Sequence, residues 1–537
     1  MNHKYIYIGV VLGGMFGWSG CSDFLDKVPD NRAELSTGNQ IRDLMKTSYP
    51  AGNISMICEL SSDNFIDNNS PDAKGSYFHL ASYDRVTDEI YAWDDIVSGQ
   101  QQDSPSNLWE ESYHSIAACN HALEAIAKLE PNVEKGSLDP HKGEALVLRA
   151  FNHFVLVNVF AQTYRDGTLS QNDPGIPYVT EPERTVSVQY ERQSVAEVYQ
   201  HIEEDLLAGL PLMDDGLYEI PKYHFNKKAA YAFAARFFLF KRDYDQVIKY
   251  ATLALTENPA SQMRDWSQEF ATAESFVYGW IKSTNPCNFL LLPTSSRFNR
   301  VHNQRYAHNR EALSGVLDGS GPTWSGSHPC YKGRLWIRGS QDYGVFFMNA
   351  GELFEYTDKV AGIGYPHIVR AEFTAEETLL CRAEAYVFKN QLGNALADLQ
   401  CWDDSRKNTP TTTIKNFPTL TEALIKSFYT PQKPLFYFQL NNTVISPEFQ
   451  VSEEQLPYVQ CVLHFRRLEN IFMGLRWFDL KRYGIEITHK IGKTDVKTLS
   501  PLDGRRAIQL PAEVIAAGIT PNIRMEKPDN NPPVLAK

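Results

Sequence analysis

The spacing of apolar positions along the chain predicts a mainly helical protein. In residues 106–130 apolar side chains recur at helical intervals, and Pro131 ends the segment. Residues 141–164 are apolar on nearly every side, which is typical of a helix buried among others. Residues 194–211 begin with Ser194, followed three positions later by Glu197, the pattern of a capping box. We therefore expect a core of packed helices.

Two stretches carry the spacing of a tetratricopeptide helix pair. In residues 223–259 two amphipathic helices are separated at Arg242, and small residues occupy the positions where paired helices approach closely. Residues 375–402 repeat the pattern, although Trp402 stands where a small residue is usual. Because the two copies are far apart, we expect tetratricopeptide-like helix pairs with long insertions rather than a continuous solenoid. This scaffold is expected to cover about 106–259 and 371–484.

The longest insertion, residues 260–370, lacks helical periodicity and is rich in Gly, Ser, Asn, Pro and aromatic residues. A structureless loop of that length is uncommon inside a compact domain. We expect a large irregular, loop-rich ligand subdomain of about 260–370 plus 60–105, with a few strands or short helices. Residues 403–455 form a second irregular stretch, and residues 456–484 return to helix.

The N-terminus has the pattern of an export signal. Residues 5–18 are mostly apolar, but the run is shorter than the about 20 residues that a membrane-spanning helix needs. Ser19, Gly20 and Cys21 follow it and resemble a lipobox, although Trp18 stands where the pattern prefers Leu. We expect a signal peptide over residues 1–20 and a lipid on Cys21. An ordinary export signal with an incidental cysteine remains the alternative.

Composition and charge restrict the class of protein. The 537 residues are 43% hydrophobic and 22% charged, as in globular proteins, and the formal net charge is −13. This charge argues against nucleic-acid binding, which usually requires a basic stripe. The eight cysteines show no metal-type spacing, and we expect most of them to be small buried side chains. A Cys287–Cys330 disulfide stays open as an alternative.

No catalytic motif is present in the chain. It lacks GxSxG, HExxH, P-loop and GxGxxG patterns, and no cofactor or metal site is expected. Glu469 and Asp479 would lie roughly 15 Å apart along one straight helix, farther than the about 5–10 Å between the carboxyl groups of glycosidases. We therefore expect the charged residues of 466–484 to be structural, with Arg–carboxylate pairs that lock the helix against its neighbours. Arg476 and Asp479 are one turn apart there.

Two polar stretches contain aromatic residues of the kind that stack on sugar rings, residues 83–107 and 319–344. Trp324, flanked by Thr, Ser and Gly, is the strongest candidate for an exposed platform. Trp93 is equally well explained as a core residue, and Trp336, which alternates with apolar neighbours, as an inward-facing strand residue. The candidate ligand-binding residues are Trp324, Tyr331, Trp336, Trp93, Tyr83 and, more weakly, Trp280.

Four stretches resemble the SusD/RagB family of surface glycan-binding lipoproteins. They are CSDFLDKVPD (21–30), LRAFNHFVLVNVFAQTY (148–164), LLCRAEAYV (379–387) and RRLENIFMGLRWFDLKRYG (466–484). The last is similar to the family signature at Arg467, Glu469, Gly474, Arg476, Trp477, Asp479, Leu480 and Arg482. Met473 and Arg466 depart from it, each where an acid is usual.

The resemblance implies a SusD-like α-α superhelix and a function. Such a protein is tethered by its lipid to the outer membrane at the cell surface. It captures oligosaccharide or polysaccharide without catalysis and passes it to a SusC-like TonB-dependent transporter for uptake. The family's glycan platform combines an early loop with a later insertion, which agrees with the positions of the two aromatic stretches. A surface lipoprotein that binds peptide or protein is the alternative, and a lipid-anchored hydrolase is a third hypothesis without a catalytic constellation.

Overall fold

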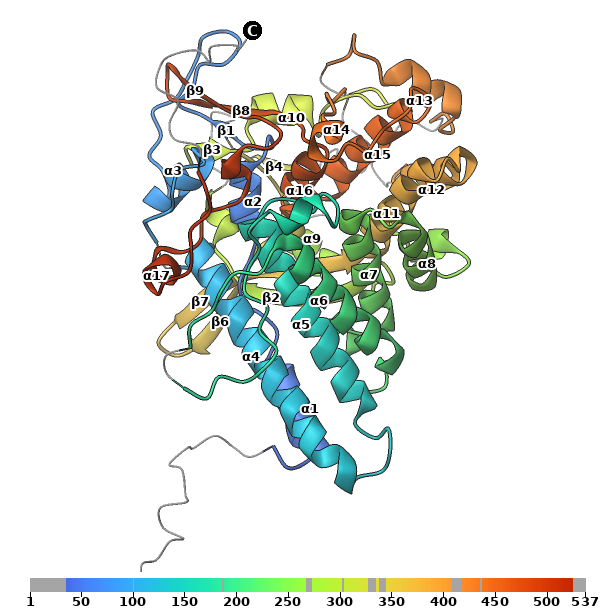
Figure 1. The fold of residues 1–537 in the computed structure, drawn as a ribbon. Helices are drawn as coiled ribbons and strands as arrows, with labels where there is room; N and C mark the ends of the chain where they lie inside the picture. Colours follow the sequence, from blue (N-terminus) through green and yellow to red (C-terminus); the bar gives the residue numbers. More distant parts are fainter. Residues whose placement is uncertain are drawn as a thin grey trace, which may run out of the picture.

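The computed structural model describes residues 35–99, 101–185, 188–266, 273–301, 304–326, 335–337, 344–407, 417–434 and 437–524. Within these ranges the fold is mainly α, as predicted (Figure 1). The helices are α1 (Gly38–Lys46), α2 (Ser55–Ser61), α3 (Arg85–Tyr91), α4 (Pro105–Leu129), α5 (Asp139–Phe160), α6 (Val195–Gly209), α7 (Lys227–Lys241), α8 (Tyr244–Leu255), α9 (Ala273–Trp280), α10 (Arg310–Gly315), α11 (Ala375–Phe388), α12 (Leu392–Ser405), α13 (Glu422–Phe428), α14 (Asn442–Ile445), α15 (Leu456–Glu469), α16 (Leu475–Arg482) and α17 (Ala512–Ala516). The strands are β1 (Ile66–Asp67), β2 (Asn288–Ser295), β3 (Tyr306–Ala307), β4 (Leu335–Ile337), β5 (Val345–Phe347), β6 (Glu352–Asp358), β7 (Ile363–Thr374), β8 (Ile487–Ile491) and β9 (Asp495–Leu499).

The long helices form one array in which each packs on the next. Helix α4 packs on α5, α5 on α6, α7 on α8, and α11 on α12, so both predicted helix pairs are confirmed. Helix α8 also packs directly against α11. The two pairs are thus neighbours in space although residues 260–370 separate them in sequence (Figure 1).

Local sequence signals define the ends of these helices. The capping box at Ser194 and Glu197 is present: the Ser194 side chain accepts a hydrogen bond from the Glu197 N–H, and the Ser194 N–H donates to the Glu197 carboxylate at 2.8 Å. Helix α7 ends at Arg242, whose φ of 66° is left-handed. The next residue, Asp243, caps the start of α8 with its side chain. These turns place consecutive helices antiparallel.

Helix α5 is the core of the array. It is the one described helix that is long and apolar enough to cross a membrane, and 94% of its most apolar window is buried inside the protein. Burial on all sides explains why its sequence shows little polar face. Its length and hydrophobicity therefore reflect packing against other helices.

The insertion before α11 contains a three-stranded antiparallel sheet in the order β2-β7-β6. Strand β7 continues directly into α11, whose N-cap is Thr374. Strands β2 and β7 pack against α7, which attaches the sheet to the helical array. At the other end, the β6–β7 hairpin leaves Phe354, Tyr356 and Tyr365 exposed.

The C-terminal signature region is not one helix, and that prediction was wrong. Helix α15 ends at Glu469 and α16 begins at Leu475. Gly474, at φ 81°, breaks the helix where the chain touches α2: a Cβ there would lie 3.0 Å from the Cys58 Cβ. The Gly474 N–H donates to the buried Glu59 carboxylate at 2.8 Å. The close approach to α2 thus requires glycine.

Candidate functional site

The early loop and the later insertion meet at one end of the molecule, as the family resemblance implies. Strand β1 pairs with β3, and the β8–β9 hairpin packs beside β1 (Figure 1). We call the segments gathered here the loop surface: residues 68–84, 297–301, 304–309 and 490–495. Apart from residues 490–495, these segments belong to the predicted ligand subdomain.

Side-chain hydrogen bonds hold the 68–84 loop in shape. The Asn69 side chain bonds the backbone of Leu80 in both directions, at 2.9 and 2.8 Å. Asp72 closes a tighter turn by accepting from the N–H groups of Lys74 and Ser76, both at 2.8 Å. The tip of the loop is therefore preorganised without help from a ligand.

Tyr77 is the exposed aromatic residue of this loop. Its side chain is 37% exposed, and the Lys493 ammonium lies 4.5 Å from the ring centroid. The His79 ring packs edge-on against it at 5.2 Å. Neither Tyr77 nor His79 was among the predicted contacts, because the polar stretch that predicted them began at Tyr83. The available signal was the run AKGSYFHLAS, in which aromatic residues stand among small and polar ones.

Tyr83 lies at the base of the same loop and is half-buried. The Arg297 guanidinium sits 5.2 Å from its ring centroid, and Arg297 also pairs with Asp84 at 3.6 Å. Below it, Arg305 joins two elements by binding Asp67 at 2.9 Å and Asp88 at 3.2 Å. Ion pairs of Arg297 and Arg305 therefore hold the base of the loop.

Trp93 is not exposed, so of the two explanations that the sequence left open the structure shows the core residue. Its side chain is 2% exposed, and its indole N–H donates to the Ser61 carbonyl at 3.0 Å. The ring stacks on His489 at 4.0 Å, and His489 stacks on Tyr91 at 4.1 Å. This buried stack joins the C-terminal hairpin to α3, so Trp93 supports the loop surface from below.

Trp324, the strongest sequence candidate, is also buried. It is 6% exposed, and its indole N–H donates to the Gly319 carbonyl at 3.0 Å. Its ring lies against Gly321, where a Cβ would overlap it, and 5.9 Å from the Phe465 ring. Gly321, which in the sequence was typical of an exposed loop, instead leaves room for the indole ring. The prediction of an exposed ring is wrong here.

The remaining candidates are Trp280, Tyr331 and Trp336. Trp280 is 4% exposed, and the Arg264 guanidinium covers its ring at 3.7 Å, so it too is not exposed. Tyr331 lies outside the described residues. The backbone of Trp336 lies in β4, as the alternation of its neighbours indicated.

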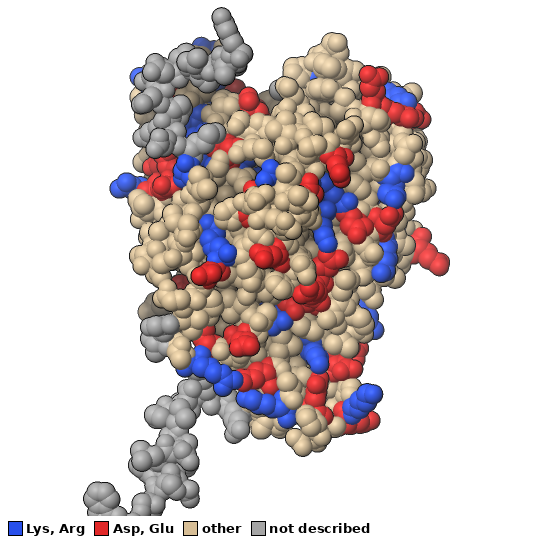
Figure 2. Space-filling view, in the orientation of Figure 1, with Lys and Arg blue, Asp and Glu red and all other residues tan. Residues whose placement is uncertain are grey.

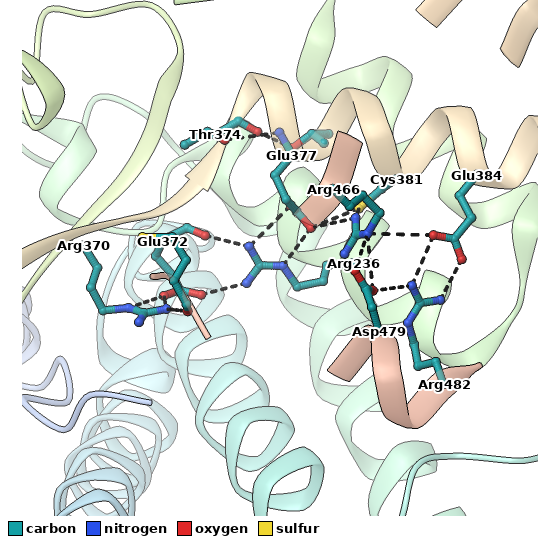
Figure 3. Close-up of polar contacts among 12 residues, drawn as sticks. Arg236, Arg370, Glu372, Thr374, Glu377, Cys381, Glu384, Arg466, Asp479 and Arg482 are labelled. Atoms are coloured by element: carbon teal, nitrogen blue, oxygen red, sulfur yellow. Dashed lines mark hydrogen bonds and ion pairs between the residues drawn. The ribbon is translucent and has the colours of Figure 1, made fainter. Parts of the chain in front are cut away.

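The signature residues form a buried ion network, shown in Figure 3. Asp479 accepts from Arg466 at 3.0 Å and from Arg482 at 2.7 Å. Arg482 in turn binds Glu384 of α11 at 2.7 Å. A second group joins it through Glu377, which binds both Arg466 and Arg236. The network ties α15 and α16 to α11 and α7, which confirms the expected structural role of the motif.

Arg476 and Asp479 are one turn apart, but they do not pair with each other. Arg476 binds Asp63 in a bidentate pair, with both distances 2.9 Å, and not Asp479. Glu469 binds Arg406 and accepts from the Trp402 indole at 2.9 Å. Glu469 and Asp479 thus serve separate ion pairs. The cavity beside Glu469 and Arg236 measures about 10 Å³, room for about one water.

Burial and nearby positive charge have opposite effects on the pKa of a carboxyl group. Burial raises the pKa of Asp479, but the Arg466 and Arg482 guanidiniums outweigh it and hold that pKa below its ordinary value. For Glu59 the balance is reversed: burial dominates, and its pKa rises to about 7 despite hydrogen bonds from Asn64 and Gly474. These shifts follow from packing rather than from a reactive site.

Some of the residues in the cysteine and metal predictions lie within the described part of the chain, and others do not. Cys287 is a free, buried thiol, whereas Cys330 and the predicted lipid site Cys21 lie outside the described residues. Among the residues that the structure describes, no group of three or more His, Cys, Asp and Glu side chains is arranged to hold a metal ion. Figure 2 shows Lys and Arg interspersed with Asp and Glu on one face, with no continuous basic stripe among its described residues.

Both the sequence and the fold are similar to those of known proteins. The family model SusD-like_3, described as "Starch-binding associating with outer membrane", matches residues 23–239. A SusD superfamily protein from Bacteroides thetaiotaomicron VPI-5482 superposes with a TM-score of 0.59 at 18% identity, over 91% of this chain and 98% of that one. A SusD-like carbohydrate binding protein from Bacteroides vulgatus ATCC 8482 gives 0.56 at 14% identity, over 90% and 96%. No curated protein matches the sequence.

The family-model match and the similar fold confirm the predicted resemblance to SusD-like proteins. The family model matches the N-terminal part of the chain, up to α7. The structural match covers 91% of the chain and so extends well beyond those residues.

Proposed function

We propose that this protein is a non-catalytic, cell-surface glycan-binding lipoprotein that passes its ligand to a SusC-like TonB-dependent transporter. The observation that carries the proposal is the family match, because that model is described as starch-binding and associated with the outer membrane. The carbohydrate-binding description of the similar Bacteroides vulgatus protein supports the same ligand class. The exposed Tyr77 and the half-buried Tyr83 of the loop surface offer ring faces on which a sugar could stack.

The loop surface offers both kinds of contact that a sugar needs. The C–H face of a sugar ring packs on an exposed aromatic ring, here Tyr77, while its hydroxyls exchange hydrogen bonds with charged and amide side chains. Lys493 and Arg297 provide donors beside the two tyrosines. Tyr77 and Tyr83 are therefore the proposed contact residues in the described part of the surface. Tyr331 and Trp336 remain proposed contacts from the later insertion.

The proposed location follows from the N-terminus. A lipid on Cys21 would hold the protein at the outer membrane. Acyl chains contribute about 0.8 kcal/mol per buried CH₂, so several chains anchor a protein stably. The helical array would then present an extended face to the transporter, as helical-repeat scaffolds present theirs to protein partners.

The test is a glycan array with the purified protein, followed by chromatography of each bound glycan after overnight incubation. We expect saturable binding to at least one oligosaccharide or polysaccharide whose chain length is unchanged afterwards. Shortened glycan would contradict the non-catalytic part of the proposal. Binding to peptides but to no glycan would contradict the ligand class.

A further inference from the structure

A cavity of about 450 Å³ opens between α4 and the segment 177–190. Ile519, just after α17, lines it on a third side, and the neighbouring α4 and α17 are visible in Figure 1. The volume falls within the about 300–1,000 Å³ that is typical of small-molecule sites. The cavity shares no residue with the loop surface.

Two aromatic residues of α4 form the floor of this cavity. Trp109 is 9% exposed and packs edge-on against Phe160 of α5 at 5.2 Å. The Tyr113 ring lies 4.9 Å from Trp109, and its hydroxyl donates to the Pro177 carbonyl at 2.8 Å. Because that hydroxyl is already bonded to the protein, Tyr113 contributes mainly ring surface to the cavity. The floor is thus rigid and aromatic.

The rim of the cavity is acidic. Glu110, Glu181 and Glu183 line it and are exposed, and none of the described lining residues is Lys or Arg. Glu183 accepts a hydrogen bond from the Tyr190 hydroxyl at 2.6 Å, which fixes its carboxylate beside the opening. The rim therefore carries three negative charges around an aromatic floor.

The arginines nearest in sequence to the rim are bound elsewhere. Arg184 pairs with Glu124 of α4. Arg192 donates to the carbonyls of Gly175 at 2.7 Å and Thr520 at 2.9 Å. Neither side chain lines the cavity, and among the described lining residues His114 is the one basic side chain.

We propose that this cavity binds a protonated amine carried by a compact organic ligand. A cation gains energy from the faces of Trp and Tyr rings and from the charge of nearby carboxylates, and a neutral sugar lacks both of these charge-dependent attractions. An amino sugar and a lysine side chain are two sources of such an amine. The site is independent of the proposed glycan contacts at Tyr77.

The test is calorimetric titration at low salt with three probes: glucosamine, N-acetylglucosamine and lysine amide. We expect binding of a protonated amine that weakens in 0.5 M salt, and no binding of the neutral N-acetylglucosamine. The tighter of the two amines identifies the source. Titrations in the Tyr77→Ala variant exclude binding at the loop surface.

The matched variants alter charge but not shape. The double variant Glu181→Gln/Glu183→Gln should weaken amine binding by about tenfold, at about three- to fivefold for each exposed charge removed. Glu134→Gln removes an exposed charge beyond the far end of α4, about 30 Å away at 1.5 Å per residue, and should change nothing. Equal binding of glucosamine and N-acetylglucosamine, no amine binding, or unchanged amine binding in the double variant would each overturn the proposal.

Discussion

Replacing Asp479 by asparagine removes one negative charge from the centre of the buried ion network. The Asp479 side chain is 1% exposed and faces two guanidiniums, those of Arg466 and Arg482. An asparagine fits the same space, but it cannot balance their charge. The substitution therefore tests the energy of the ion pairs with little change in packing.

The expected loss follows from the partners that remain. Removing one member of a buried ion pair costs about 3–5 kcal/mol, because the other charge stays buried. Arg482 keeps Glu384 at 2.7 Å, and Arg466 keeps Glu377 at 3.5 Å. These contacts place the cost at the lower end, about 3 kcal/mol in the free energy of unfolding.

Urea unfolding followed by far-UV circular dichroism measures this difference. The matched control is Asp245→Asn, which breaks a pair of similar length, 2.9 Å to Lys389, but whose carboxylate is 72% exposed. Exposed pairs contribute at most about 1 kcal/mol. Equal destabilisation by the two substitutions would refute the argument that burial gives the network its energy.

Three further predictions use the same unfolding assay. Gly474→Ala should cost about 1–3 kcal/mol, because alanine is strained at φ 81° and its Cβ would meet Cys58. Trp324→Ala should cost about 3–5 kcal/mol, because it empties a buried site. Burial raises the pKa of Glu59 from 4.5 to about 7, so the folded protein holds a proton that the unfolded chain releases between those values. Stability should therefore fall by up to about 3 kcal/mol as pH rises through that window, and Glu59→Gln should remove this dependence.

Each of these predictions has an outcome that contradicts it. An unchanged urea midpoint in Gly474→Ala would mean that α2 and the signature turn are not in close contact. A Trp324→Ala variant as stable as wild type would contradict the burial of Trp324. If wild type and Glu59→Gln had parallel stability–pH profiles between pH 4.5 and 7, another group would carry that titration.

The helical part of the fold was predictable because its signals are local. Periodic apolar residues, the Ser194 capping box and the alanine spacing of α7 each act within one or two turns, and the structure confirms all three. The contact between α8 and α11 was not predictable, since nothing local records which surfaces meet across a 110-residue insertion. The break at Gly474 depends in the same way on α2, which is remote in sequence.

The candidate site was less predictable, because exposure is a tertiary property. A tryptophan beside glycine fits an exposed loop and a tightly packed core turn equally well, and Trp324 proved to be the second. The exposed Tyr77 stood in a polar run without a motif, and the Lys493 that contacts it comes from the opposite end of the chain. Sequence alone predicted two loop regions that meet in the fold, but not which rings they expose.

The most direct test of the account is calorimetric titration of the tightest glycan from the array into wild type, Tyr77→Ala and Tyr223→Ala. Tyr223 is also 37% exposed but lies on the helical scaffold, so it is a matched control. We expect Tyr77→Ala to weaken binding at least about tenfold, the loss of about 1.4 kcal/mol that is typical of a contact aromatic. Tyr223→Ala should bind as wild type does. Equal affinity of all three proteins would contradict the assignment of glycan binding to the loop surface.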